Sequence, residues 1–191
     1  KLSTGLKINK ASDDASGLAI ADKLRTQVTS INQGVANGNS AITLLQIADK
    51  SMAEQSKILD TVKSKLIQAN TATTSADGRE SIRKDITKLL EQLDNIAQQT
   101  NYNGNYLLQL DATSGAAATA ALEFQVGEKT SDMITMSAVQ ANTTGLALTG
   151  LTGLTTSGTL TTTAAQTGQG SVDSAITTLN GYRGDIGSTQ N

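Results

Sequence analysis

The sequence contains no cysteine, no histidine and no proline, and only 2% of its 191 residues are aromatic. Without cysteine the chain has no disulfide and no thiol nucleophile. Without histidine it lacks the commonest metal ligand and general base. A globule of this length normally uses more large rings than Phe124, Tyr102, Tyr106 and Tyr182, whereas a helical bundle with an aliphatic interior needs few. These absences favour a helical protein that is not an enzyme and needs no cofactor.

Charge and long hydrophobic runs are scarce as well. The formal net charge is −2 with no dense basic run, so binding to nucleic acid has little support. No stretch approaches 18 consecutive apolar residues, so we expect no membrane span. The chain begins at Lys1 without a hydrophobic signal segment, and residues 187–191 still have a helical pattern. We therefore expect both natural ends to have been trimmed.

The absence of proline permits one very long helix, predicted from about Ser12 to about Asn70. Its apolar positions advance by threes and fours, which keeps one stripe on one side of a helix. The stripe comprises Leu24, Val28, Ile31, Val35, Gly38, Ile42, Leu45, Met52, Leu59 and Leu66. It then drifts towards Ala48, Ile58 and Val62, because a straight helix falls about 20° behind a heptad with each repeat. Such a stripe needs partners from the rest of the chain.

Two local features of this helix have alternative interpretations. Ser12 or Asp13 is a good N-cap, and a calcium site at Asp13 and Asp14 has little support because no loop of further oxygen ligands follows. Gly34 and Gly38 each weaken the helix by about 1 kcal/mol relative to alanine. Close approach by another helix explains them, as does a bend or a contact between subunits.

A second helix is predicted from about Arg79 to Gln99. Residues 71–78 are rich in threonine and serine and end on glycine, which indicates a loop. The stripe that follows consists of Ile82, Ile86, Leu89, Leu93 and Ile96. A short loop before a matching stripe predicts an antiparallel helical hairpin. The outer face, with Arg83, Lys84, Asp85, Lys88 and Glu91, is typical of a solvated surface.

The C-terminal half changes character. Asn103-Gly104 is a turn signal, and residues 122–126 and 133–139 alternate as two strands of a β-hairpin over about 122–139. Residues 142–170 form an uncharged tract of Thr, Gly, Ala, Ser and Leu, for which we expect a mobile insertion or an irregular β-rich knob. Its hydroxyl groups are candidate glycan acceptors. A helical pattern returns in residues 171–191.

Together these elements predict a mainly α fold: an elongated bundle of long helices, two N-terminal and one C-terminal, with a β-hairpin region and a small variable insertion. Residues 1–141 form the N-terminal part of a rod domain, with helices at about 12–70 and 79–99. Residues 142–170 are the insertion, and residues 171–191 are the C-terminal helix of the rod.

Three segments resemble one family. Residues 1–9 (KLSTGLKIN) with Ala11-Ser12-Asp13-Asp14-Ala15-Ser16-Gly17 resemble the N-terminal signature of bacterial flagellin, of the form LSSGLRIN followed by A-x-DDA-x-G. Residues 99–104 (QTNYNG), containing Asn103 and Gly104, are similar to its turn after the second helix. Residues 182–191 (YRGDIGSTQN) resemble its C-terminal motif RADLGAxQN through Arg183, Asp185, Gln190 and Asn191.

The resemblance implies a structural subunit of the flagellar filament that lacks the terminal segments lining the inner tube. It implies stacking with other subunits into protofilaments, whose alternative packings give supercoils for swimming, with residues 122–139 as the proposed switching region. It also implies export through the flagellar channel to the cell exterior without a signal peptide, helped by an export chaperone and a cap protein.

Flagellins are ligands of a vertebrate Toll-like receptor, and the resemblance aligns the receptor-facing region with residues 59–68. Leu59, Val62 and Gln68 fall in this region, and Asp85 stands where the family has a glutamate. Thr61 replaces the arginine critical for recognition, and Lys65 replaces a leucine. Threonine cannot supply the donor fork of arginine, and an ammonium group in an apolar contact is costly to desolvate. We therefore predict weak or absent receptor activation.

Two alternatives remain. The hook–filament junction protein shares the N-terminal pattern but usually has proline after the paired aspartates, where this chain has Ala15. A helical coiled-coil adaptor would also show long paired stripes, but it would not require the β-hairpin or the three signature segments. A zinc-protease insertion, which some flagellins carry, needs a histidine pair that is absent here.

Overall fold

The computed structural model describes residue 5 and residues 15–191, so the N-cap expected at Ser12 or Asp13 lies outside the described residues. The chain divides into two compact units. The described residues of unit 1 are residue 5, residues 15–41 and residues 123–134. Unit 2 contains residues 42–122 and 135–191.

Helices dominate the described chain. Helix α1 spans Ala15–Ala69, α2 spans Ala76–Gln99, α3 is a single turn at Thr149–Thr152, and α4 spans Thr162–Gln190. Each predicted long helix is therefore present, and the prediction of a mainly α fold is confirmed. None of the helices in the described part of the chain is long and apolar enough to cross a membrane.

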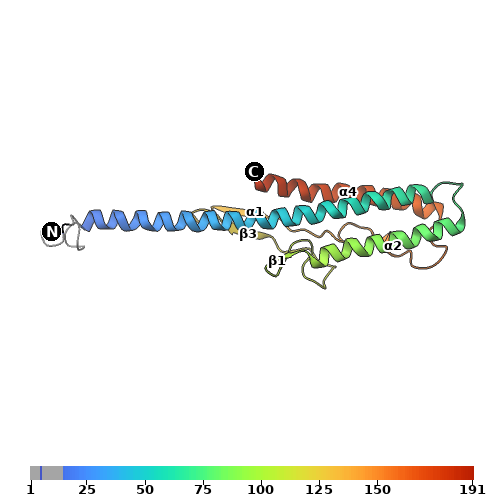
Figure 1. Cartoon of the computed structure of the whole chain (residues 1–191), viewed down its shortest axis with the longest axis horizontal. Helices are drawn as coiled ribbons and strands as arrows, with labels where there is room; N and C mark the ends of the chain where they lie inside the picture. The colour runs from blue at the N-terminus through green and yellow to red at the C-terminus, as the bar shows by residue number, and fades with distance from the viewer. Residues whose placement is uncertain (1–4, 6–14) are drawn as a thin grey trace. The chain divides into compact units, whose positions relative to one another are not determined.

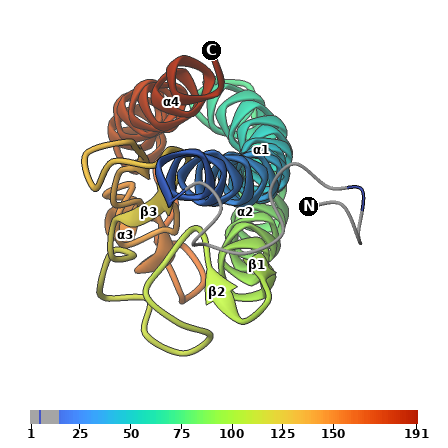
Figure 2. The same ribbon diagram turned by 90° about the vertical axis from the view of Figure 1, so that its left-hand side faces the viewer.

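Unit 2 is built from residues 42–69 of α1, α2 and α4. Figure 1 shows α2 and α4 running alongside the cyan part of α1, and Figure 2 places them on different sides of it. Polar pairs define the directions. Towards α2 they are Thr100–Ser51 and Lys65–Asp85, and towards α4 they are Arg183–Asp49 and Lys63–Asp173. Both helices therefore run antiparallel to α1. For α2, this direction agrees with the antiparallel hairpin predicted from the short loop before it.

The core of unit 2 follows the predicted stripe of α1 from Leu45 onward, whereas the stripe residue Ile42 is 40% exposed. The buried apolar α1 residues of unit 2 are Leu44, Leu45, Ala48, Met52, Ile58, Leu59, Val62, Leu66 and Ala69. The earlier part of the same stripe is different: Leu24, Val28, Ile31 and Val35 are 56–58% exposed. The stripe is thus one sequence pattern with two environments.

Helix α2 begins at Ala76, three residues before the predicted start. Ser75 is the N-cap, and its Oγ accepts a hydrogen bond from the Gly78 amide at 3.0 Å. Ile82, Ile86 and Leu93 are buried as predicted. Leu90 and Ala97 are buried in place of Leu89 and Ile96, which are half-buried. The buried face is therefore rotated slightly, because two partners, α1 and the 142–161 segment, cover α2.

Helix α4 begins at Thr162, so the expected start at residue 171 was wrong. Thr161 caps the helix by accepting a hydrogen bond from the Ala164 amide at 3.1 Å. The first two turns face the core with Ala165 and Gly168. A Cβ on Gly168 would lie 2.7 Å from a Leu151 methyl group and 3.2 Å from a Leu66 methyl group, so these leucine side chains pack closely against the glycine. A search for large apolar residues misses such small buried positions.

The uncharged tract is also packed, which corrects the expectation of a mobile or β-rich insertion. Leu146, Leu148, Leu151 and Leu160 are all less than 5% exposed. The tract forms α3 and then the start of α4. Its buried leucines are few and unevenly spaced, so no periodic pattern reveals them, and charged side chains of α2 hold its backbone by hydrogen bonds.

Two short strand pairs complete the fold. Strands β1 (Asn101–Tyr102) and β2 (Asn105–Tyr106) pair antiparallel, with Asn101 opposite Tyr106. The turn between them has positive φ at Asn103 (52°) and Gly104 (81°), as a type I′ hairpin requires. Strands β3 (Leu122–Gln125) and β4 (Met133–Met136) form the predicted hairpin with somewhat shorter strands.

The two environments of the α1 stripe predict different costs for the same substitution. Leu59→Ala should lower the free energy of unfolding by about 2–5 kcal/mol, because Leu59 is fully buried. Leu24→Ala should change it by no more than about 0.5 kcal/mol, because Leu24 is exposed. Urea denaturation followed by circular dichroism measures both, and equal costs would contradict the described burial.

Candidate functional site

The residues aligned with the receptor-facing region occupy two environments. Leu59 and Val62 are 0% exposed and belong to the core of unit 2. Thr61 and Gln68 are exposed on the outer face of α1, with Lys65 half-exposed between them. The spacing of four and three residues places these last three on one face of the helix. These three side chains therefore reach solvent, whereas those of Leu59 and Val62 do not.

Lys65 and Asp85 are brought together across α1 and α2. The Lys65 ammonium lies 3.1 Å from the Asp85 carboxylate. Because both side chains are at least a third exposed, such a pair contributes about 0–1 kcal/mol to stability. The pairing nevertheless ties the Asp85 carboxylate to a cation of its own chain. One turn away, the Thr61 hydroxyl donates to the Lys57 carbonyl at 3.1 Å.

The signature residues are scattered rather than gathered into one site. Arg183 Nε donates to Asp49 Oδ1 at 2.9 Å and ties α4 to α1. The Asp185 side chain is exposed, and Gln190 and Asn191 end the described α4. Asn103 and Gly104 form the β1–β2 turn. Gly17 lies in the first turn of α1, whereas Asp13 and Asp14 lie outside the described residues.

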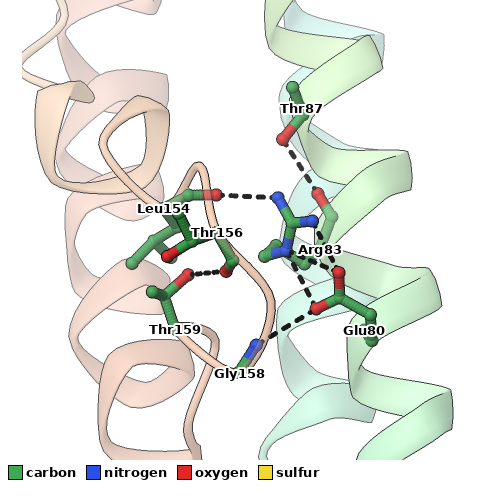
Figure 3. A network of polar contacts seen from close by, with 7 residues as sticks. All are labelled: Glu80, Arg83, Thr87, Leu154, Thr156, Gly158 and Thr159. Atoms are coloured by element: carbon green, nitrogen blue, oxygen red, sulfur yellow. Dashed lines mark hydrogen bonds and ion pairs between the residues drawn. The ribbon is translucent and has the colours of Figure 1, made fainter.

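A polar network that the sequence analysis missed joins α2 to the 142–161 segment (Figure 3). Arg83 makes several hydrogen bonds to the Glu80 carboxylate, the shortest at 2.6 Å, and also donates to the Leu154 carbonyl at 3.1 Å. The Gly158 amide donates to the other side of the same carboxylate at 3.3 Å. Arg83 was expected on a solvated face, but its side chain is only 11% exposed.

This network shifts the acidity of Glu80. Hydrogen bonds from Arg83 lower the pKa of Glu80 from 4.5 to about 2, with a smaller contribution from the Gly158 amide, while burial works in the opposite direction. The pKa of Arg83 is raised by the same hydrogen bonds. The charged form of the pair is therefore the form that holds the loop against α2.

Two further polar contacts fix the same region. Asp94 accepts hydrogen bonds from both the amide and the hydroxyl group of Thr143, each at 2.8 Å. Gln55, which is fully buried, donates from Nε2 to the carbonyl groups of Leu93 and Ala141 at 3.2 and 2.6 Å. No periodicity argument could find these residues, because each depends on a partner more than thirty residues away.

A further surface feature is the exposed part of the α1 stripe. Ile20, Leu24, Val28, Ile31 and Val35 are each 56–60% exposed and recur every three or four residues. Contiguous apolar patches of this kind mark protein–protein interaction sites. Among residue 5 and residues 15–191, no cluster of three or more carboxylates is placed to hold a metal ion.

Comparison with known proteins points to one family. Residues 1–113 match the family described as the bacterial flagellin N-terminal helical region. Flagellin B of Helicobacter pylori is 45% identical over 139 residues, which is 70% of this chain and 27% of that protein. Flagellin A of Helicobacter felis is 48% identical over 134 residues, or 70% and 25%.

More distant relatives agree. The flagellar filament 33 kDa core protein of Treponema phagedenis is 32% identical over 130 residues, or 66% of this chain and 46% of that protein. The crystal structure of Bacillus cereus flagellin superimposes with a TM-score of 0.67 at 28% identity, covering 81% of this chain and 82% of that one. The chain spans about a quarter of the length of the Helicobacter relatives.

The Glu80–Arg83 network predicts a specific pH dependence. The folded pKa of Glu80 is below its unfolded value, so its contribution to stability is present above about pH 4.5 and is lost as pH falls towards 2. We expect native protein to be more stable than Glu80→Gln at pH 6, and this difference to shrink as pH falls from 4.5 to 2. Urea denaturation at a series of pH values measures it.

Glu91→Gln, which removes an exposed carboxylate of α2 outside the network, is the matched control. A stability difference between native protein and Glu80→Gln that stays constant down to pH 2 would show that the network does not favour the ionised carboxylate.

Proposed function

The chain belongs to the bacterial flagellin family, and we propose on that basis that it is part of a structural subunit of the flagellar filament. The subunits polymerise into protofilaments, and the filament serves swimming motility. The match of residues 1–113, which includes α1 and α2, carries this proposal. The protein acts outside the cell, in the filament, after export through the flagellar channel.

The exposed stripe of α1 supports an assembly role. Five large aliphatic side chains are exposed to solvent in this stripe. Moving such a side chain from full exposure to full burial is favourable by about 1.5–3 kcal/mol of free energy. A polymer supplies surfaces that can cover them. Within residues 42–69 the large hydrophobic residues Ile42 and Ile67 are still 40% and 52% exposed, but most of the exposed apolar side chains of α1 lie before residue 36, in the N-terminal part of the helix.

The role proposed is structural rather than catalytic. Several described carboxylates are tied into structural contacts such as Glu80–Arg83 and Asp94–Thr143, and others are exposed on the surface. Other copies of the subunit are the main partners. The export chaperone and the cap protein are further partners that the family suggests.

We also propose that the chain is a poor ligand of the flagellin-sensing Toll-like receptor. Thr61 offers a hydroxyl group where the family has a guanidinium group, and that hydroxyl donates to its own helix. Lys65 places a charge where the family has a leucine, and it pairs with Asp85. The receptor would have to break this pair and desolvate both groups before it could contact the surface.

Seeded filament growth tests the assembly proposal. Full-length protein containing this sequence should add to filament ends, as observed by electron microscopy. Replacing Leu24 and Ile31 together by Gln should slow growth strongly while leaving the thermal unfolding of this chain unchanged, because both residues are exposed.

Thr26 and Asn32, exposed polar residues of the same helix, give the matched control when both are replaced by Gln. Normal growth of the Leu24/Ile31 variant would contradict a role of the stripe in assembly. Discrete rings or caps from the unsubstituted full-length protein would instead favour a hook–filament junction protein.

Receptor activation gives a second test. In a cell reporter assay the native protein should signal weakly, and the double variant Thr61→Arg with Lys65→Leu should signal more strongly, because it restores the donor fork and the apolar contact. A variant with Lys57→Leu, which changes an exposed lysine one turn from Thr61, is the control. Robust signalling by native protein at nanomolar concentration would overturn the proposal.

A further inference from the structure

Gly34 is buried although its neighbours Gln33 and Val35 are exposed. The backbone of the segment that follows β3 covers it. A Cβ built on Gly34 would overlap the carbonyl oxygen of Val126 and would lie 2.8 Å from its carbonyl carbon. Because real Cβ atoms do not approach backbone atoms so closely, only glycine at this position permits the observed contact.

One turn later, Asn37 holds the same segment by a directed hydrogen bond. Its Nδ2 donates to the Gln125 carbonyl at 2.7 Å. Its Oδ1 accepts a hydrogen bond from Gln33 Nε2 at 2.9 Å, which fixes the orientation of the amide group. Gly34 and Asn37 therefore act on consecutive residues of the segment, Val126 and Gln125.

The segment itself is stabilised by its own hydrogen bonds. The Val126 amide donates to the Asp132 carbonyl at 2.9 Å, and Gln125 Nε2 donates to the Gly127 carbonyl at 2.6 Å. The Lys129 amide donates to the Asp132 carboxylate at 3.0 Å. None of these bonds involves α1, so the turn can keep its conformation when its position on α1 changes.

There is also room for such a change. A groove of about 380 Å³ runs beside the contact, lined by Thr29, Gln33 and Asn37 from α1 and by Gln125 and Thr130 from the segment. The groove is open to solvent, so a turn that moves sideways meets no packed core there.

We propose that Gly34 and Asn37 form a latch that fixes the position of residues 123–134 on α1. The glycine admits the Val126 carbonyl, and the asparagine holds the adjacent Gln125 carbonyl. Filling the glycine position displaces the segment while leaving its internal hydrogen bonds and helix α1 intact. The latch concerns the isolated chain and does not depend on its role in a filament.

Gly38 provides a matched control on the same helix. A Cβ on Gly38 would lie 3.8 Å from a Val126 methyl group, which is an ordinary contact. Gly34→Ala and Gly38→Ala should therefore favour the helix to a similar degree, because both replace a helical glycine by alanine. They differ in whether the added methyl group meets backbone.

Spin labels can measure the position of the segment, since a chain without cysteine permits labelling only at introduced sites. Asn32→Cys on α1 and Lys129→Cys on the turn are both exposed positions. Pulsed electron paramagnetic resonance should give the same distance distribution for the native background and for Gly38→Ala. Gly34→Ala should shift the distribution to longer separations, and Asn37→Leu should broaden it.

Circular dichroism should show unchanged helix content in all variants, which separates displacement of the segment from unfolding. A Gly34→Ala distribution that coincides with that of Gly38→Ala would overturn the latch. An equal shift in both glycine variants would also overturn it, because the effect would then come from any added methyl group. Because filaments are absent, the outcome is independent of whether the protein assembles.

Discussion

Unit 2 depends on the burial of one face of α1 between Leu44 and Ala69. Leu45, Met52, Leu59 and Leu66 are at most 1% exposed. Because α2 and α4 both run antiparallel to this part of α1, one stripe organises two interfaces. The small side chain at Gly168 lets α4 approach Leu66 closely, so the packing relies on size as much as on hydrophobicity.

The uncharged 142–161 segment shows how a sequence of low complexity can still be ordered. Its leucines supply the apolar anchors, and its backbone and hydroxyl groups are held by charged residues of α2, namely Glu80, Arg83 and Asp94. Hydrogen bonds to charged groups are stronger than neutral ones, which makes a few of them sufficient to fix a short segment. Order in this segment is therefore a property of α2 as well as of the segment itself.

The first part of α1 combines features that unit 2 does not have. Its apolar stripe is exposed, while Gly34 and Asn37 contact residues 125–126 through backbone atoms. The proposed role of the stripe in assembly and the proposed role of Gly34 and Asn37 in positioning the β3–β4 turn thus fall on different residues of one helix segment. Exposed apolar side chains of this kind are typical of surfaces that contact another protein.

The amino-acid sequence determined the helical class, the end of α1 near Asn70, the antiparallel α1–α2 pair, the Asn103-Gly104 turn and the family. These follow from local periodicity, from turn chemistry and from short motifs, all of which are contiguous in the chain. Only the tertiary structure decided that the stripe is exposed up to Val35 but buried from Leu45, that α4 starts at Thr162, and that Arg83 donates to the Leu154 carbonyl. The reason is physical: burial, close approach at glycine and hydrogen bonding depend on partners distant in sequence, and one chain read alone does not reveal which partners meet.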